Sequence, residues 1–324
     1  MAKSLKEIKQ PIEAELKQFE THFREAMRSP VPLLDRITYY IVRRKGKQVR
    51  PIFVFLAAKI CGDISESTFR AASLVELLHT ATLVHDDVVD DSFERRGFFS
   101  INALWKNKIA VLVGDYFFSQ GMLLALKHKE YRQLDIVSTA VKAMSEGELL
   151  QIEKARRLDI TEDVYYDIIR NKTASLIASA CSAGASSATN DDAVIELMRL
   201  FGEKLGIAFQ IRDDLFDFGS EDVGKPLGID IKEKKMTLPL IYALQHAPKK
   251  DRRYIINIIK NHSENAEKVK EVINFVQQSG GLEYSQKAMN DYRDQAFQLL
   301  NTFPETTARE SLKDLVAFIT DRKR

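Results

Sequence analysis

Two acidic motifs of the same form lie far apart in the chain: Asp86-Asp87-Val88-Val89-Asp90 and Asp213-Asp214-Leu215-Phe216-Asp217. At about 100° and ~1.5 Å per residue of an α-helix, the first and last carboxylates of each motif lie on one face, about one turn apart. Like charges at this spacing repel each other. The neighbouring residues, such as Leu83 and Phe209, are apolar and partly exclude water. Each motif therefore needs a cation.

The residue types narrow the choice of cation. Carboxylates without clustered Cys or His favour hard divalent ions, and Mg²⁺ binds one or two carboxylates while waters and a substrate phosphate complete its coordination. We interpret the two motifs as a site for a diphosphate that Mg²⁺ bridges between two helices. The alternatives are a solvated acidic face and a helix N-terminus complemented by acids. Neither motif has the alternating ligands and central Gly of an EF-hand loop.

A diphosphate also needs direct cationic donors, and two basic segments are candidates. In Gly46-Lys47-Gln48-Val49-Arg50-Pro51, Lys47 supplies a point charge and Arg50 a bidentate fork, while a solvated basic helix end is the alternative. Arg95-Arg96-Gly97 follows the first acidic motif closely enough for its arginines to clamp phosphate oxygens. Ordinary salt bridges to Glu94 or Asp91 are the alternative there.

Helical spacing adds polar residues to both motifs. His79 lies seven residues before Asp86 and returns to nearly the same azimuth two turns earlier, which favours a role in the site over a structural one. Gln210 stands in the same relation to Asp214 and Asp217 and would reach the same ligand. Spacing alone gives only weak support to Lys172-Thr173, Lys225 and Lys235 as further donors.

Composition excludes some classes of protein. The chain has 324 residues, 45% of them hydrophobic, which is enough for a substantial core. Its 48 basic and 46 acidic residues nearly cancel, so a global field for nucleic acid or a membrane is not expected. Cys61 and Cys181 have apolar or small neighbours and no metal-ligand spacing, which indicates reduced thiols in a cytoplasmic protein.

No membrane or secretion signal is evident. The start of the chain does not combine a basic region, an apolar run and a small-residue cleavage site. The longest apolar stretch, residues 109–126, is interrupted by Asp115 and Gln120, which favours a buried core helix over a transmembrane segment.

Proline positions and periodicity predict long helices. After Pro51 no proline occurs until Pro226, and the stretch between them has helical periodicity broken by glycines and short polar turns. Strand signals are essentially missing. We therefore predict an all-α chain of about ten or more helices in one domain spanning residues 1–324. Expected loops lie at residues 28–32, 95–97, 182–191 and 219–235.

Together these segments resemble the trans-isoprenyl diphosphate synthases, also called polyprenyl synthetases. The similarity spans nearly the whole chain and is more specific than any single motif. Besides the two acidic motifs it includes Gly46–Pro51, Glu76-Leu77-Leu78-His79, His85, Arg95-Arg96-Gly97, Gly114-Asp115-Tyr116, Lys172-Thr173, Phe209-Gln210, Gly224-Lys225 and Lys235-Met236-Thr237-Leu238-Pro239.

The resemblance implies the isoprenoid synthase fold, a bundle of long helices around a central cavity, with the two aspartate motifs facing each other. It implies that Asp86, Asp90 and Asp213 bind about three Mg²⁺ ions, and that Asp87, Asp214 and Asp217 ligate or support them. The implied site for isopentenyl diphosphate consists of Gly46, Lys47, Arg50, His79 and Arg96. The implied contacts to the allylic diphosphate are Arg95, Lys172, Lys225 and Lys235.

The implied activity is that of a prenyltransferase which condenses isopentenyl diphosphate with geranyl, farnesyl or geranylgeranyl diphosphate. Mg²⁺, Lys and Arg stabilise the charge that develops on the leaving diphosphate. Thr173 and Gln210 would flank the allylic cation, which the double bond of isopentenyl diphosphate attacks. A proton is then lost to the departing diphosphate. A homodimer is expected from the family.

Two departures and three competing functions accompany the resemblance. Phe98-Phe99 stand where the family has small or polar residues and proline, and Lys234 replaces a common glycine. A terpene cyclase is disfavoured by Asp217 and the lysine-rich set for a second substrate. A membrane aromatic prenyltransferase would need several spans, and a non-catalytic subunit of a heteromeric synthase would be expected to lose aspartates.

The residues below the first aspartate motif indicate a long product. In the family, bulky aromatics four and five residues before the first aspartate stop short chains, but Thr82 and Ala81 stand here. Leu78 and Val75 lie further down that face, and Phe117, Phe118 and Met122 could close the tunnel deeper. An isoprene unit spans ~5 Å, so we expect roughly six to eight units, as in a quinone side chain, with peripheral membrane contact possible at product release. A shorter-chain synthase and a catalytic subunit that requires a partner are the alternatives.

Replacing Ala81 with Tyr is expected to shorten the product, because the aromatic ring would restore a floor below the first motif. Mass spectrometry of the prenyl diphosphates formed by the two proteins measures this. An unchanged product spectrum would remove this account of length control.

Overall fold

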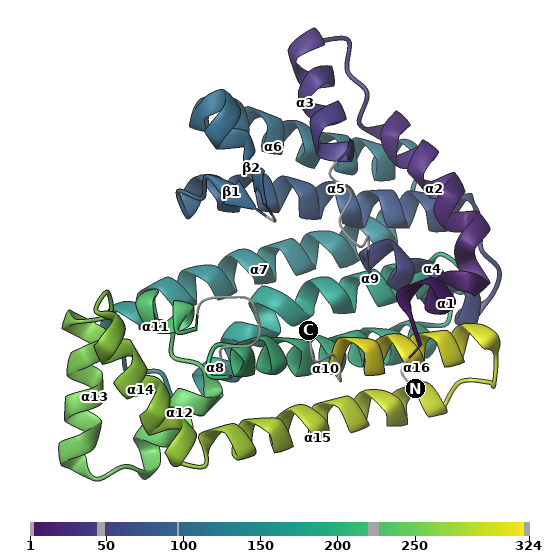
Figure 1. Cartoon of the computed structure of the whole chain (residues 1–324). Helices are drawn as coiled ribbons and strands as arrows, with labels where there is room; N and C mark the ends of the chain where they lie inside the picture. The colour runs from purple at the N-terminus through teal and green to yellow at the C-terminus, as the bar shows by residue number, and fades with distance from the viewer. Residues whose placement is uncertain (1–2, 44–48, 96, 220–226, 321–324) are drawn as a thin grey trace.

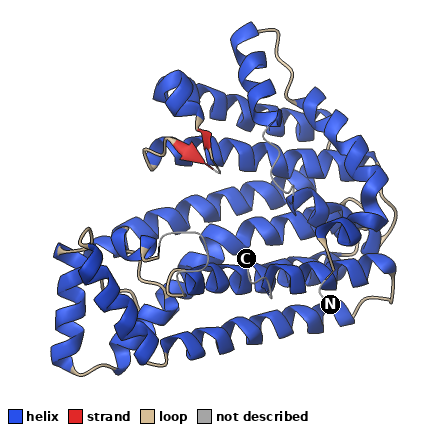
Figure 2. Ribbon diagram, in the orientation of Figure 1, coloured by secondary structure: helices blue, strands red, loops and turns tan. Residues whose placement is uncertain are grey.

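Helices make up almost all of the computed structural model, which describes residues 3–43, 49–95, 97–219 and 227–320 (Figures 1 and 2). The N-terminal half contains α1 (Leu5–Lys9), the 3₁₀ turn η1 (Gln10–Ile12), α2 (Glu13–Ala26), α3 (Pro32–Arg43), α4 (Val49–Cys61), α5 (Glu66–Val89), α6 (Ile101–Lys127) and α7 (Tyr131–Arg157). The C-terminal half contains α8 (Glu162–Ile169), the π-helical turn η2 (Arg170–Ala174), α9 (Ser175–Ser186), α10 (Asp192–Phe216), α11 (Ile229–Lys232), α12 (Leu238–His246), α13 (Lys249–Asn261), α14 (Ala266–Gln278), α15 (Gly281–Asn301) and α16 (Thr307–Thr320). The predicted all-α fold is confirmed. The described residues add only β1 (Glu94–Arg95) and β2 (Phe98–Phe99), one short antiparallel pair.

The core is centred on two helices that carry few charges. In α4 every residue from Pro51 to Ala58 is buried, and in α9 nearly every residue from Leu176 to Ala185 is buried. Helices that are apolar or small all round must lie inside a bundle. The longer α5, α7 and α10 surround them and carry the candidate site residues.

A second group of buried side chains lies beyond the bundle centre, where α8 and α12 to α14 meet the end of α10. It includes Tyr165, Ile211, Ile241 and Val272. This group supports one wall of the candidate site, because Tyr165 and the residues just before α12 also line that site.

The helices that carry the two acidic motifs begin at capped N-termini. The Asp191 side chain accepts from the backbone N–H of Ala193 at 2.9 Å at the start of α10, and Ser65 and Thr68 form a capping box at the start of α5. A capped N-terminus fixes where a helix starts. Asp90 and Asp217 are the C-terminal caps of α5 and α10, so both motifs occupy the last turn of their helices.

The helix α6 differs from the sequence prediction. It forms one long helix over the predicted apolar stretch, and among the described residues it alone has the length and apolarity of a membrane span. It is not the buried core helix that we predicted, because only 33% of its most apolar window is buried. Leu112, Leu123 and Leu126 are 56%, 58% and 48% exposed. One face packs on α5, and the opposite face is an apolar surface.

Candidate active site

Both acidic motifs lie at helix C-termini, where the partial negative charge of the helix dipole adds to the repulsion among carboxylates. The alternative of acids that complement a helix N-terminus is therefore wrong. In Figure 1 the C-terminal ends of α5 and α10 both lie at the end of the bundle that carries β1, β2 and α11. The requirement for a cation is stronger than the sequence alone indicates.

The charges around Asp90 link the first motif to the second. Burial and Glu148 raise the pKa of Asp90, whereas Lys172 and Lys235 lower it. Glu148 lies on α7, Lys172 in η2 and Lys235 just before α12. Asp90 therefore lies close enough to both lysines of the second half of the chain for their charges to act on it.

His85 braces the helix end that carries the first motif. Its Nε2 atom lies 3.2 Å from the Val111 carbonyl and 3.6 Å from Asp115 Oδ1 on α6. A Cβ added to Gly114 would lie 2.1 Å from this ring, so only glycine lets α6 approach so closely. This contact gives Gly114-Asp115 a positioning role for Asp86, which follows His85 directly.

The carboxylates of the second motif have different partners. Asp213 is exposed and lines a cavity, whereas Asp214 is only 4% exposed. Both oxygens of Asp214 accept hydrogen bonds, one from the Tyr165 hydroxyl at 2.6 Å and one from Gln210 Nε2 at 2.8 Å. Asp214 thus supports neighbouring side chains, and Asp213 is the carboxylate of the pair that is available to a ligand.

Asp217 holds the next helix in place. Its Oδ1 and Oδ2 atoms accept from the backbone N–H groups of Ile229 at 2.8 Å and Asp230 at 3.1 Å. Burial raises the pKa of Asp217, and these hydrogen bonds oppose the shift. The hydrogen bonds that Asp217 accepts thus help to position Asp230 in the wall of the cavity. There Asp230 Oδ1 lies 3.9 Å from Lys235 Nζ.

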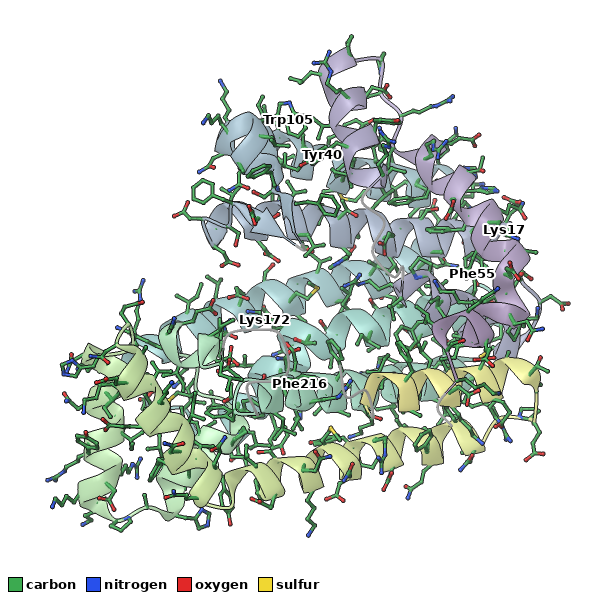
Figure 3. All side chains as sticks on the ribbon, in the orientation of Figure 1. Lys17, Tyr40, Phe55, Trp105, Lys172 and Phe216 are labelled. Atoms are coloured by element: carbon green, nitrogen blue, oxygen red, sulfur yellow. The ribbon has the colours of Figure 1, made fainter. Side chains whose placement is uncertain are left out.

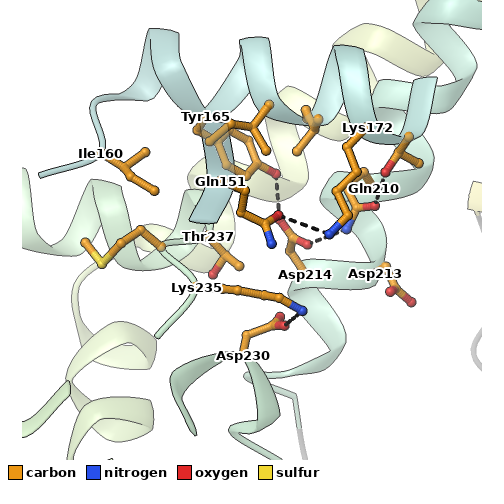
Figure 4. A pocket seen from close by; sticks show the side chains of 14 residues that line it. Gln151, Ile160, Tyr165, Lys172, Gln210, Asp213, Asp214, Asp230, Lys235 and Thr237 are labelled. Atoms are coloured by element: carbon orange, nitrogen blue, oxygen red, sulfur yellow. Dashed lines mark hydrogen bonds and ion pairs between the residues drawn. The ribbon is translucent and has the colours of Figure 1, made fainter. Parts of the chain in front are cut away.

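A cavity of about 250 Å³ lies between η2, α8, α10 and the segment before α12 (Figure 4). Its polar lining includes residues that the sequence analysis named and others that it did not; together they are Gln151, Tyr165, Lys172, Thr173, Gln210, Asp213, Asp214, Asp230, Lys235 and Thr237. Ile160, Ile168, Ile169 and Met236 form the apolar part. Charged and apolar walls in one cavity suit a ligand with a charged head and an apolar body.

Lys172 and Lys235 are both paired with acids. Lys172 Nζ lies 2.5 Å from Glu148 Oε2 and 3.4 Å from Gln151 Oε1, and Lys235 pairs with Glu233. Figure 3 shows Lys172 between α7 and the lower helices of the bundle. A Cβ on Gly147 would lie 2.8 Å from the Lys172 backbone N, so η2 sits directly against α7. A π-helical turn at this point is typical of functional sites.

The site also contains residues that the sequence does not predict there: Tyr165, Glu148, Gln151 and Asp230. Tyr165 lies seven residues before Lys172, a helical spacing that could have revealed it. Asp230 lies five residues before Lys235 in an expected loop, and Glu148 and Gln151 are ordinary residues of a long helix. Only the packing of α7 on η2 brings these two to the site.

Several predicted substrate-binding residues lie outside the described part of the chain: Gly46, Lys47, Arg96, Lys225 and the side chain of Arg95. Arg50 lies in the first turn of α4 and is half-buried. His79 lies on α5 with Asp86, as predicted, and is 7% exposed. Asp87 is 6% exposed, so its carboxylate is more enclosed than that of Asp90.

The predicted length-determining residues lie mostly in the interior. Val75, Leu78, Ala81 and Phe117 are buried, and the Thr82 hydroxyl donates to the His79 carbonyl at 2.9 Å. Two residues of α6 lie away from the deep end of the predicted tunnel. The stacked rings of Phe118 and His85 have centroids 5.9 Å apart, so Phe118 lies beside the first motif and not deeper. Met122 is 42% exposed on the outer surface.

Lys234, one of the two departures, occupies a left-handed conformation. Its φ is +57°, a region that glycine enters without strain. Its Nζ atom donates to the Lys260 carbonyl at 3.0 Å, at the end of α13. This hydrogen bond helps a non-glycine residue to hold the turn before Lys235. Of the other departure, Phe98 and Phe99 are 51% and 54% exposed in β2.

Comparison with known proteins agrees with this geometry. The polyprenyl synthetase family model matches residues 31–276. The chain is 36% identical over 319 residues to the all-trans-nonaprenyl-diphosphate synthase (geranyl-diphosphate specific) of Rhodobacter capsulatus, which covers 98% of this chain and 97% of that protein. It is 34% identical over 307 residues to heptaprenyl diphosphate synthase component 2 of Bacillus subtilis (strain 168), which covers 94% and 87%. The crystal structure of a decaprenyl diphosphate synthase from Rhodobacter capsulatus superposes with a TM-score of 0.93 at 33% identity, covering 99% of this chain and 100% of that one.

The all-α bundle with two aspartate motifs at one end therefore defines the class, and the chain belongs to the polyprenyl synthetase family. It is a prenyltransferase that makes all-trans polyprenyl diphosphates, an activity that implies isopentenyl and allylic diphosphates as substrates.

We expect Asp230→Asn to stabilise the ligand-free protein in a pH-dependent way. Burial raises the pKa of Asp230 from 3.8 to about 6, so stability that is present below pH 4 is lost as the pH rises through 6. Above that range the ionised carboxylate costs roughly 3 kcal/mol, which Asn would remove. Thermal unfolding should show a Tm gain of a few degrees at pH 8 and little change at pH 4.

The matched control is Asp159→Asn, which changes an exposed loop residue and should leave both melting temperatures unchanged. An equal gain from Asp230→Asn at both pH values would contradict the assignment of a buried, charged carboxylate.

Proposed function

We propose that the residues of this cavity carry out Mg²⁺-assisted transfer of an allylic prenyl group to isopentenyl diphosphate. The observation that supports this most directly is the charge pattern around Asp90, which couples the first acidic motif to the two lysines of the cavity. Two acidic helix ends that face common lysines suit a diphosphate complexed with divalent cations.

The donor set fits Mg²⁺. Asp86, Asp90 and Asp213 offer hard oxygen atoms that are at least partly exposed. Among the residues described, no group of three or more His, Cys, Asp or Glu is close enough to hold an ion alone. This fits an ion that takes one or two carboxylates and completes its coordination with phosphate and water. When bound, Mg²⁺ would neutralise charge on the leaving diphosphate.

We assign the remaining roles to residues of the chain. Lys172 and Lys235 exchange their carboxylate partners for oxygens of the allylic diphosphate and stabilise its departure. Asp230 joins Asp213 at the metal side, whereas Asp214 and Asp217 hold their neighbours. Thr173 and Gln210 flank the developing cation. The proposed roles of the other residues follow the resemblance: Lys47, Arg50, His79 and Arg96 for isopentenyl diphosphate, and Arg95 and Lys225 for the allylic diphosphate.

We further propose a product of roughly six to eight isoprene units. Thr82 and Ala81, four and five residues before Asp86, stand where the resemblance places bulky aromatics in short-chain synthases, which supports a longer product. The relatives named above are called heptaprenyl, nonaprenyl and decaprenyl synthases, so they favour a long product without fixing its length.

We also propose that residues 1–324 act as one domain in a cytoplasmic homodimer. The exposed apolar face of α6 supports self-association, because contiguous apolar surfaces on soluble proteins often mark interaction sites. The free thiols of Cys61 and Cys181 fit a reducing compartment. The alternative is a second, different subunit, since the Bacillus subtilis relative is named as a component.

Asp213→Asn is expected to lower kcat/KM by at least about 1,000-fold, because the amide cannot replace a charged metal ligand. The assay is chain extension of farnesyl diphosphate with isopentenyl diphosphate and Mg²⁺, with products sized by mass spectrometry. EDTA should abolish it. Asp91→Asn is the control: Asp91 is exposed with φ +47°, which Asn tolerates, so activity should stay within about twofold.

Retained activity in Asp213→Asn would contradict the proposed metal role. Absence of chain extension by the wild-type protein alone would favour the requirement for a partner, and cyclic hydrocarbon products would favour a cyclase.

Leu123→Glu is expected to dissociate the dimer, because it buries a charge in the proposed α6 contact. Sedimentation velocity at micromolar concentration measures the change. Gln245→Glu, which adds the same charge at an exposed position of α12, should leave the dimer intact. A wild-type protein that sediments as a monomer would refute the homodimer.

A further inference from the structure

Four polar side chains form a continuous hydrogen-bonded chain along one wall of the cavity. The Thr173 hydroxyl donates to Gln210 Oε1 at 2.7 Å, and Gln210 Nε2 donates to Asp214 Oδ1 at 2.8 Å. The Tyr165 hydroxyl donates to Asp214 Oδ2 at 2.6 Å. Figure 4 shows Tyr165 from α8 and Gln210 from α10 converging on Asp214. The chain connects a buried tyrosine to a threonine that lines the cavity.

The hydrogen bonds give each proton in this chain a direction. The Tyr165 hydroxyl and the Gln210 amide N–H both donate to Asp214. Burial raises the pKa of Asp214 to about 8, and these two hydrogen bonds oppose the rise because they stabilise the ionised form, which only accepts. The Gln210 carbonyl then faces Thr173 and accepts the single proton of that hydroxyl. Thr173 is therefore left with oxygen lone pairs, and no proton, to direct into the cavity.

Because both groups are buried, water cannot easily replace the hydrogen bond from Tyr165 to Asp214. Tyr165 is 3% exposed and Asp214 is 4% exposed, so water has little access to the oxygen that the tyrosine occupies. Without the Tyr165 hydroxyl, Asp214 would lack a donor on Oδ2 and could rotate. Gln210 would then lose its fixed acceptor, and Thr173 would be free to turn its proton toward the cavity.

We propose that Tyr165 is a positioning residue of prenyl transfer, which acts through Asp214 and Gln210 to keep the lone pairs of Thr173 directed at the allylic cation. This inference rests on the proposed function, in which Thr173 and Gln210 flank that cation. An oriented oxygen dipole stabilises positive charge as it develops, whereas a hydroxyl proton in the same place would oppose it. The stabilisation acts mainly in the transition state, so it affects turnover more than substrate binding.

Tyr165→Phe tests the proposal, since it removes one hydroxyl and keeps the ring. We expect kcat for extension of farnesyl diphosphate to fall on the order of 10-fold or more, with the KM of both diphosphates within about twofold. A residue that only supports the fold would not produce this separation of kcat from KM. Tyr166→Phe is the matched control: Tyr166 is half-buried and packs on Tyr292, so its variant should keep wild-type kcat.

Thr173 variants test the cavity end of the hydrogen-bonded series independently of Tyr165. Thr173→Ser keeps the hydroxyl and should retain more of the wild-type kcat than Thr173→Val, which should lose as much as Tyr165→Phe. The double variant Tyr165→Phe/Thr173→Val should be no slower than the slower single variant, because both changes remove the same interaction.

Three results would overturn the proposal: wild-type kcat in Tyr165→Phe, losses that multiply in the double variant, and equal kcat for Thr173→Ser and Thr173→Val. The last comparison can still refute the proposal if Tyr165→Phe does not fold. Failure of the proposed function is distinguishable, because the wild-type protein itself would then not extend farnesyl diphosphate.

Discussion

Repulsion among carboxylates at two helix C-termini is the constraint on which the rest of the site depends. Asp90 and Asp217 cap α5 and α10 at the ends where the helix dipoles are also negative. Such ends are stable only beside positive charge, and the described structure supplies it with Lys172 and Lys235. Both lysines are already paired with acids, so the carboxylates of the two motifs leave the described site with an excess of negative charge. Divalent cations that accompany a diphosphate would offset this excess.

The second aspartate motif illustrates how equal side chains acquire different tasks. Asp213 is exposed to the cavity, Asp214 is enclosed by Tyr165 and Gln210, and Asp217 accepts from the backbone of α11. The motif therefore combines a carboxylate for ligands, one for orientation and one for folding the next segment. Repetition of a sequence pattern does not require repetition of function within it, because burial and the nearest donors decide what each carboxylate can bind.

Close backbone contacts hold these groups in place. Gly114 lets α6 approach His85 beside the first motif, and Gly147 lets α7 approach η2 beside Lys172. A side chain at either position would push apart two elements that carry site residues. On the other side of the contact with α5, α6 carries an exposed apolar face.

The sequence by itself determined the all-α fold, the two acidic motifs and the family resemblance, because helical periodicity and motif spacing are local properties of the chain. His79 and Asp86 share α5 as their seven-residue spacing predicts, and no long-range contact was needed to place them together. The tertiary structure alone brought Tyr165, Glu148, Gln151 and Asp230 to the site, and it alone moved Phe118 up to His85 and Met122 to the surface. These outcomes depend on the packing of α7 on η2 and on the antiparallel course of α5 and α6. Spacing along one helix carries no information about which side of it a distant segment will cover.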